Sequence, residues 1–266
     1  MRVLVLLAGI VDPKRPLLRA SVDEARQEVV TGLPSTLSPF DEAALEVALK
    51  LRDAVPEVGI GAALLCAGND PATDDPLARQ VAAHRLDEVY LLHADAGLRW
   101  DHCRFALALG GWMHTREPAP ELVLLGREFG DNDDGTLAAA LAEMLTRPLF
   151  AHASAVEASA GTPSLVRTTV DGDEQVGFDM PLVASITNDR GNRLRHPLMK
   201  NVAAARRMNF SRVDLPADGR SAGVVPIAAA PVERDARAVT GRRLEGSLDA
   251  RVDALAAFLS GWTAAR

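Results

Sequence analysis

Short apolar runs alternate with amphipathic segments through the first 150 residues of the chain. The runs have strand length and no polar alternation, which is typical of strands buried on both faces. Alternation of this kind with short connections predicts a parallel sheet covered by helices on both sides. We expect strands and helices to alternate, beginning with a strand, over Arg2–Leu7, Asp41–Ala54, Gly59–Cys66, Asp74–Arg85, Glu88–His93, Asp101–His114, Glu121–Gly126 and Thr136–Leu145.

The pattern changes after residue 150. Further strands are expected over Ala151–Glu157, Ser164–Val170, Gln175–Asp179 and Leu182–Thr187, with Asp171-Gly172 as a hairpin turn and a short helix over Pro197–Arg207. We therefore predict an α/β domain over residues 1–207 with an added hairpin.

Residues 208–246 are rich in Pro, Gly, Ala and Arg and show no sustained period, so we predict an extended arm. The arm leads into a predicted amphipathic helix, Ser247–Trp262, for which Ser247 is the expected cap. Its apolar residues recur at spacings of three and four: Leu248, Val252, Leu255, Leu259 and Trp262. This stripe either packs on the chain's own core or docks on a partner subunit. Residues 208–266 thus form a second predicted region.

Composition excludes several classes of protein. The 266 residues carry a net charge of −7 and no Lys/Arg-rich run, which argues against a nucleic-acid surface. Cys66 and Cys103 lie far apart, so we expect no disulfide framework and a cytoplasmic location. The opening apolar run Val3–Val11 is too short to span a membrane, and we expect no integral membrane protein. His84, His93 and His102 match no metal motif, so no metal is expected.

The segment Ser38-Pro39-Phe40-Asp41-Glu42 has the signature of a helix start. Ser38 can cap the helix, Pro39 suits its first position, and Glu42 adds an acid to the first turn. Unpaired backbone N–H groups at such an end favour a phosphate or another anion. The Phe40 ring is placed to lie against a planar ligand.

A second candidate segment follows the predicted strand that ends at Gly126. A polar loop runs from Arg127 to Gly135, and Thr136 opens the next helix. Loops at the carboxyl ends of parallel strands are where open α/β sheets bind ligands. The alternative is a capped surface turn without a ligand.

These segments resemble the β subunits of electron transfer flavoproteins (ETF). Residues 38–42 resemble the family's Asn-Pro-Phe-Asp-Glu segment, with Ser38 in place of Asn, and residues 124–128 resemble its Leu-Leu-Gly-Lys-Gln segment. Cys66 stands where the family often has Cys-Gly-Pro, and residues 166–183 and Met199-Lys200 match in the same order. The resemblance covers roughly residues 2–207. The family's Lys-Arg-Val-x-Asp after the first strand is replaced here by residues 8–13.

The resemblance implies a HUP-type (adenine nucleotide alpha hydrolase-like) nucleotide-binding domain with AMP bound structurally. It also implies FAD shared with an ETF α subunit in a heterodimer. Electrons would pass from a flavin dehydrogenase or an iron–sulfur partner to a quinone-linked acceptor, and no catalytic residues of the chain's own are expected. The implied cofactor-binding residues are Leu6, Ser38, Pro39, Phe40, Asp41, Cys66, Gly126, Arg127, Asp131, Asn132, Asp133, Gly135 and Thr136.

The resemblance also implies docking surfaces. The family's partner-recognition loop corresponds to residues 187–207, which are about five residues shorter here. Leu194 is either a substitute anchor for a redox partner or a packing residue. Leu255 and Trp262 are the candidate docking residues of the C-terminal stripe.

Other functions share this fold. A bifurcating-type ETF β subunit would hold FAD in the β site. A non-redox, stress-protein-like adenine-nucleotide module would need a Gly-x-x-Gly-x(9)-Gly-[Ser/Thr] loop, which is absent. An ATP-pyrophosphatase would need Ser-Gly-Gly-x-Asp-Ser after the first strand, where this chain has residues Leu7–Asp12.

Overall fold

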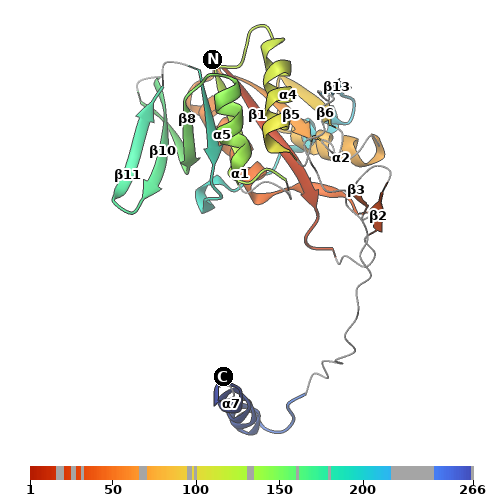
Figure 1. Cartoon of the computed structure of the whole chain (residues 1–266), viewed down its shortest axis with the longest axis vertical. Helices are drawn as coiled ribbons and strands as arrows, with labels where there is room; N and C mark the ends of the chain where they lie inside the picture. Colours follow the sequence, from red (N-terminus) through yellow and green to blue (C-terminus); the bar gives the residue numbers. More distant parts are fainter. Residues whose placement is uncertain are drawn as a thin grey trace. The chain divides into compact units, whose positions relative to one another are not determined.

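A computed structural model describes residues 1–15, 21–24, 28–30, 33–65, 71–94, 98, 101–130, 135–159, 162–178, 181–216 and 243–264 (Figure 1). In chain order the elements are β1 (Arg2–Val11), β2 (Ser21–Asp23), β3 (Glu28–Val30), β4 (Ser35–Leu37), α1 (Pro39–Ala54), β5 (Gly59–Leu65), α2 (Pro71–Ala82), β6 (Glu88–His93), α4 (His102–His114), β7 (Leu122–Gly126), α5 (Thr136–Met144), β8 (Leu149–Ala153), β9 (Ala155–Ser159), β10 (Thr162–Thr169), β11 (Gly172–Gly177), β12 (Leu182–Ile186), the 3-10 helix η1 (Arg190–Asn192), α6 (Met199–Ala205), β13 (Ser211–Asp214) and α7 (Leu248–Ala264).

The main sheet is parallel and has β1 at its centre. Its strand order is β13-β6-β5-β1-β7-β12-β8, and β4 pairs antiparallel with the end of β1. β1 pairs with β5 on one side (Val5 beside Ala62) and with β7 on the other (Val5 beside Leu124). The predicted α/β class with a parallel sheet is confirmed.

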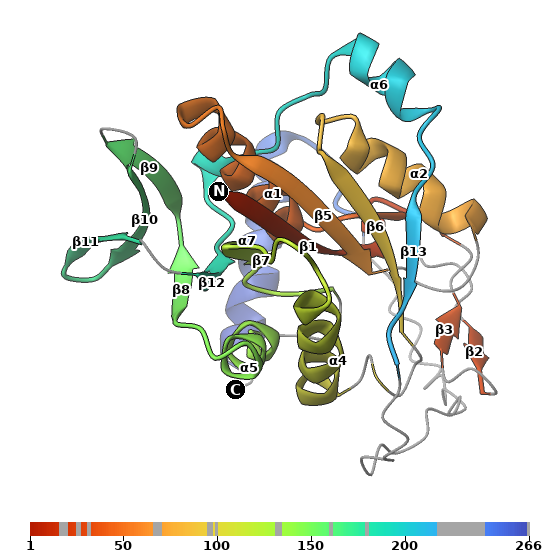
Figure 2. The ribbon, with the colours of Figure 1, turned by 90° about the horizontal axis from the view of Figure 1, so that it is seen from above.

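Helices cover both faces of this sheet (Figure 2). Alternate residues of β1 divide between two hydrophobic cores because successive side chains of a strand point to opposite faces. Val3, Val5 and Leu7 pack with residues of α1 and α2, whereas Leu4 and Leu6 pack with residues of α4 and α5. A strand buried on both faces explains why β1 reads as one continuous apolar run.

The helices follow the predicted periodicity closely. On α1, Ala44, Leu45, Ala48 and Leu51 are fully buried, as their spacing predicts. α4 begins after Asp101, whose Oδ1 accepts a hydrogen bond from the Arg104 backbone N–H at 3.1 Å. β6 covers the predicted residues Glu88–His93.

Several predicted bounds are wrong. The helix expected over Asp74–Arg85 is α2, Pro71–Ala82, and the strand expected over Gln175–Asp179 is β11, Gly172–Gly177. β1 continues beyond Leu7 to Val11, because its end pairs with β4. The strand predicted over Ala151–Glu157 is two strands in different sheets, β8 and β9, which separate at Ser154. Residues 211–214 were predicted as part of an extended arm, but they form β13 at the edge of the main sheet.

β9, β10 and β11 form a small antiparallel sheet beside β8 (Figure 1). The hairpin between β10 and β11 turns at Asp171-Gly172, as predicted, and Gly172 has φ of 132°, which favours glycine. Arg167 on β10 pairs with Glu174 on β11 at 2.6 Å. The predicted hairpin is thus confirmed, with β9 as its third strand.

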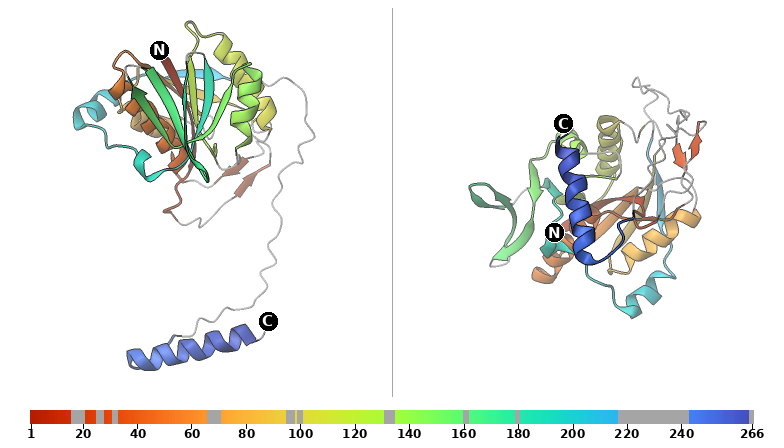
Figure 3. Two further views of the ribbon diagram at one scale, coloured as in Figure 1. Left: turned by 90° about the vertical axis from the view of Figure 1, so that its left-hand side faces the viewer. Right: turned by 90° about the horizontal axis from the view of Figure 1, so that it is seen from below.

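The chain divides into two compact units, Met1–Ala228 and Ala229–Arg266. The first unit therefore runs past the boundary expected at residue 207. In the second unit, α7 is one uninterrupted helix (Figure 3), and the Ser247 hydroxyl accepts a hydrogen bond from the Ala250 N–H at 3.3 Å. Leu248, Val252, Leu255, Phe258 and Leu259 are all exposed.

Among the described residues, no helix is long and apolar enough to cross a membrane.

Candidate functional site: the carboxyl ends of β1 and β7

The order of the strands defines the candidate site. After β1 the chain forms β5 and β6 on one side of β1 within the sheet. It then returns to form β7 on the other side of β1. Ligands of open α/β sheets bind outside the carboxyl ends of the strands, at the point where the strand order reverses. That point lies between β1 and β7, next to the first turn of α1.

A capping box closes the first turn of α1. The Ser38 hydroxyl accepts a hydrogen bond from the Asp41 N–H at 3.0 Å, and the Asp41 carboxylate accepts one from the Ser38 N–H at 3.0 Å. The predicted Ser38 cap is therefore confirmed. The box reduces the number of unpaired N–H groups that the helix start offers, because Pro39 has no N–H and the N–H of Asp41 is bonded to Ser38.

Asp41 is fully buried, which sequence reasoning missed. Its second carboxylate oxygen accepts a hydrogen bond from the Ala8 backbone N–H at 3.1 Å, so it joins the end of β1 to the start of α1. Burial raises the pKa of the Asp41 carboxyl from 3.8 to about 7, although its hydrogen bonds to Ala8 and Ser38 act in the opposite direction. An acid in the first turn of a helix is usually exposed and interacts favourably with the helix dipole. The sequence therefore gave no clear signal that Asp41 is buried.

Gly126, at the end of β7, packs directly against α1. A methyl group at position 126 would lie 2.7 Å from Phe40 Cβ and 2.8 Å from the Glu128 carbonyl oxygen. Gly130 has φ of 70°, and a methyl group there would lie 3.4 Å from Ala8 Cβ. The structure thus brings the first turn of α1 and the loop after β7 together at one end of the sheet.

Several predicted site residues lie at this end of the sheet. Phe40 is partly exposed, and Pro39, Arg127 and Thr136 are exposed. Gly135, with φ of 115°, is the N-cap residue of α5. Leu6 is fully buried among the side chains that pack against α4 and α5. Cys66, Asp131, Asn132 and Asp133 lie outside the described residues.

The described residues at this end of the sheet have chemistry that fits an adenylate. Within the described part of the chain no carboxylate forms a salt bridge with the exposed Arg127, so its guanidinium suits a phosphate. The partly exposed Phe40 ring suits a planar base or ring. Gly126 and Gly130 let the backbone approach closely, and no described side chain here forms an acid–base pair for catalysis.

The segment after β12 is tied firmly to α1. Arg195 contacts the buried Glu46 carboxylate through its side chain, with Nη2 2.7 Å from Oε1, and through its backbone N–H at 3.1 Å. It also reaches Asp53 at 2.5 Å, and the hydrogen bonds to Glu46 raise the pKa of Arg195 further. Sequence reasoning missed this network, although an acid between Leu45 and Val47 on a buried helix was a usable signal.

A second set of contacts holds the same segment. Lys50 Nζ donates to the Gly191 carbonyl oxygen at 2.7 Å and to Asn192 Oδ1 at 3.0 Å. The Asn192 side chain is buried and donates to the Ser154 carbonyl oxygen at 2.5 Å. These bonds give residues 190–195 a defined position on the surface of α1.

Leu194 and its neighbours differ in exposure. Leu194 is partly buried and packs against the core that contains α1. Leu198 and Met199 are 60% and 79% exposed, respectively. Of the two roles left open for Leu194, its packing role is therefore the one that the described contacts support.

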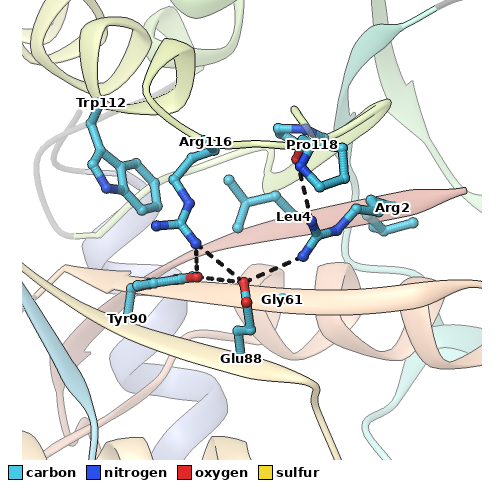
Figure 4. Close-up of a pocket in the computed structure, with 10 residues that line it drawn as sticks. Arg2, Leu4, Gly61, Glu88, Tyr90, Trp112, Arg116 and Pro118 are labelled. Atoms are coloured by element: carbon cyan, nitrogen blue, oxygen red, sulfur yellow. Dashed lines mark hydrogen bonds and ion pairs between the residues drawn. The ribbon is translucent and has the colours of Figure 1, made fainter.

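Two further hollows lie away from the predicted residues. The first, of about 30 Å³, lies at the amino ends of β1, β5 and β6 (Figure 4). Glu88 there accepts hydrogen bonds from Tyr90 and Arg116 and forms an ion pair with Arg2 at 3.5 Å. The charged groups that line this hollow are thus paired with each other. The volume of the hollow suits one or two water molecules rather than a nucleotide.

The second hollow, of about 510 Å³, lies between α4 and β13. Its lining is mainly apolar and includes Leu107, Trp112 and Val213, with Arg104 and Asp214 as charged members. No predicted site residue lines either hollow. The candidate site at the carboxyl ends of β1 and β7 thus rests on the strand order and on the predicted residues gathered there.

A parallel sheet covered on both faces, with a loop and a helix start meeting at its switch point, defines a doubly wound α/β protein. Comparison with known proteins narrows this class. The family model described as "Electron transfer flavoprotein domain" matches residues 28–218. The chain belongs to the electron transfer flavoprotein family and is similar to its β subunits.

Three relatives illustrate the range of similarity. The electron transfer flavoprotein subunit beta of Mycobacterium tuberculosis is 28% identical over 183 residues, which is 68% of this chain and 67% of that protein. The mitochondrial subunit beta of Oryza sativa subsp. japonica is 29% identical over 264 residues, covering 96% of this chain and 97% of that protein. The subunit beta of Megasphaera elsdenii is 24% identical over 240 residues, covering 88% and 85%. This chain is accordingly an electron-transport protein of the flavoprotein type.

Proposed function

We propose that this chain is the β subunit of an ETF heterodimer that holds AMP at the carboxyl ends of β1 and β7. Its α subunit holds most of the FAD, and this chain supplies one wall over the flavin. The flavin supplies the redox chemistry when bound, while this chain binds and positions the nucleotide. The observation that supports the proposal best is the family match, which spans both segments that meet at that end of the sheet.

Several residues of the candidate site have a role in this proposal. Arg127 binds the phosphate, Phe40 lies against a planar ring, and Gly126 keeps the loop after β7 close to α1. Asp131, Asn132, Asp133, Gly135 and Thr136 belong to the loop that holds the adenylate. We propose further that the complex carries electrons from a flavin dehydrogenase or an iron–sulfur partner to a quinone-linked acceptor in the cytoplasm.

Coexpression with an ETF α subunit tests this proposal. We expect a yellow 1:1 heterodimer that releases one FAD and one AMP on denaturation, and we expect the isolated chain to bind no flavin stably. Two FAD and no AMP per heterodimer would replace the proposal with the bifurcating type. A colourless chain that binds AMP and no α subunit would favour the non-redox nucleotide-binding module.

We propose that the redox partner docks on Leu198 and Met199. These two exposed side chains follow the segment that Arg195 and Lys50 tie to α1. They are flanked by exposed cations, although the net charge of the chain is −7. Among the described residues, Arg195 is the cation of this segment that forms salt bridges. The cations are Arg190, Arg193, Lys200, Arg206 and Arg207. An apolar pocket with an acidic rim is the matching partner surface.

Electron-transfer rates with the dehydrogenase test this surface. We expect Leu198→Ser to slow reduction of the heterodimer by the dehydrogenase, and we expect the rate of the unmodified protein to fall as the salt concentration rises. Leu194→Ser is the matched control. Because Leu194 is partly buried against the core, this substitution should lower the melting temperature, while the folded fraction is still reduced by the dehydrogenase at the unmodified rate. The reverse pattern would assign the anchor to Leu194.

A further inference from the structure

The hollow between α4 and β13 has the size and the lining of a small-molecule site. Its volume is about 510 Å³. Pockets that hold small ligands commonly measure about 300–1,000 Å³ and combine apolar walls with a few polar groups. None of the residues proposed for the nucleotide lines this hollow. A molecule bound there would therefore be a second ligand of the chain.

The α4 wall of the hollow is open at Gly111. A methyl group at position 111 would meet no atom within 4 Å, and Ala108, one turn earlier, adds only a small side chain to the same wall. Leu107, which is 51% exposed, borders these two residues, and Val213 of β13 also lines the hollow. Glycine permits a close approach of a ligand to the backbone, so this wall suits a flat ring.

Trp112 gives the hollow an aromatic wall whose position is fixed. It lines both this hollow and the small hollow at the amino ends of the strands. On the side of the small hollow, the Tyr90 ring meets it edge-on with 5.3 Å between centroids, and the Arg116 guanidinium lies 5.9 Å from its centroid (Figure 4). The indole is thus held in place without a ligand, which lowers the entropy cost of binding another ring.

The charged residues that line the hollow are Arg104 and Asp214. Arg104 is half-buried, whereas Asp214 is exposed and can remain solvated. A guanidinium carries five N–H donors, so Arg104 can bind an acid group while it keeps its contacts within the protein. Its planar fork also matches the geometry of a carboxylate or a similar anion.

We infer that the hollow between α4 and β13 binds a small planar aromatic acid. The ring system lies between the two elements, beside Gly111 and Trp112, and Arg104 binds the acid group. Burial of apolar ring surface drives the binding, and the ionic hydrogen bond orients the ring.

Two fluorescent probes with the same rings test the inference. 8-Anilinonaphthalene-1-sulfonate carries a sulfonate, and N-phenyl-1-naphthylamine lacks it. We would titrate the full-length chain into each probe and follow the probe fluorescence. We expect one site for each probe, with a dissociation constant of about tens of micromolar for the sulfonate and about tenfold weaker binding of the neutral probe.

The indole N–H resonance of Trp112 locates the bound probe. Trp112→Phe assigns this resonance, and the sulfonate probe should shift it at the concentrations that saturate the fluorescence. A shift of the Trp262 resonance alone would place the probe on α7 and overturn the inference. Binding only at millimolar concentrations would overturn it too.

Variants of the lining separate the ring from the acid group. Gly111→Leu fills the open part of the wall without a clash at its Cβ, so both probes should bind at least tenfold more weakly. Gly177→Leu is the matched control, because Gly177 is exposed on β11 and a methyl group there also meets nothing within 4 Å. Arg104→Gln should weaken the sulfonate probe about tenfold and leave the neutral probe unchanged.

The remaining outcomes would each overturn the inference. Equal effects of Gly111→Leu and Gly177→Leu would show that the probes bind elsewhere. An Arg104→Gln variant that binds both probes as before would remove the acid from the description of the ligand. Displacement of the probe by an added ETF α subunit would assign the hollow to a protein partner. The probe titrations need neither AMP nor FAD, so their result is independent of the proposed function.

Discussion

At the scale of single residues, Gly126 controls how closely the loop after β7 approaches α1. Gly126→Ala would place a methyl group 2.7 Å from Phe40 Cβ and 3.1 Å from the Phe40 carbonyl carbon, so backbone must move. We expect a loss of about 1–3 kcal/mol in the free energy of unfolding, together with weaker AMP binding. Denaturant unfolding and AMP titration measure the two effects.

Gly111 provides the matched control for that substitution. It lies on the exposed side of α4, and a methyl group there would meet nothing within 4 Å. Gly111→Ala should be neutral or stabilise the protein by up to about 1 kcal/mol, because alanine favours a helix more than glycine does. Equal losses at the two positions would show that the contact with Phe40 is unimportant.

The buried acid Asp41 also makes stability depend on pH. Its pKa is about 7 in the folded chain and 3.8 ordinarily, so the folded state binds the proton more tightly. Its contribution to stability is therefore fully present below about pH 4 and is lost as pH rises through about 7. Relative to Asp41→Asn, the unmodified chain should lose up to about 4 kcal/mol over that window. Parallel curves of unfolding free energy against pH for the two proteins would contradict this expectation.

At the scale of elements, the segment after β12 depends on its attachment to α1. Arg195→Ala would leave the buried Glu46 carboxylate without its main partner. Because Arg195 is itself 41% exposed, we expect a moderate cost of about 1–3 kcal/mol rather than that of a fully buried pair. Hydrogen exchange should rise over residues 189–196.

Arg193→Ala is the control for the attachment. Arg193 is exposed, so its removal should leave the melting temperature unchanged and slow association with the acidic partner surface. A melting temperature that falls equally in both variants would argue against a specific role of the Arg195–Glu46 pair.

Local patterns were sufficient to predict most elements of the first unit. The spacing of apolar residues on α1 and the cap at Ser38 depend on neighbouring residues, and both are confirmed. β13 could not be predicted in this way, because Val213 pairs with Leu92, a residue distant in sequence. The break at Ser154, where β8 of the main sheet ends and β9 of the small sheet begins, could not be predicted either. Apolar residues continue on both sides of Ser154.

The candidate site was predictable in its segments but not in its details. The carboxyl end of β7 and the start of α1 could be named because each has a local signature. Their contact through Gly126, and the bond from Asp41 to Ala8, depend on how β1 and β7 pair with each other. Tertiary contacts of this kind leave no trace in the spacing of residues.

At the scale of the whole molecule, the second unit presents an apolar helix. Leu248, Val252, Leu255 and Leu259 are exposed on α7, while the side chain of Trp262 lies outside the described residues. We propose that this stripe, including Leu255 and Trp262, docks on the α subunit. Each large side chain buried there would contribute about 1.5–3 kcal/mol before entropy losses.

Truncation before Ser247 tests this proposal. We expect the dissociation constant of the heterodimer to rise by at least about a hundredfold, because about 3 kcal/mol corresponds to that factor. The thermal melt of the isolated chain should change little. A melt that collapses while the affinity of the folded fraction is unchanged would show that α7 belongs to the core of its own chain.

The position of β13 has a consequence for synthesis on the ribosome. β6 emerges early, but the strand that covers its outer edge is built from Ser211–Asp214, and Ser211 follows its partner Tyr90 by 121 residues. Until those residues leave the exit tunnel, the nascent sheet presents a row of open backbone N–H and C=O groups along β6. Chains that stall or are cut before residue 211 should therefore be the species that depend on chaperones and aggregate, although they contain every residue of the proposed nucleotide site.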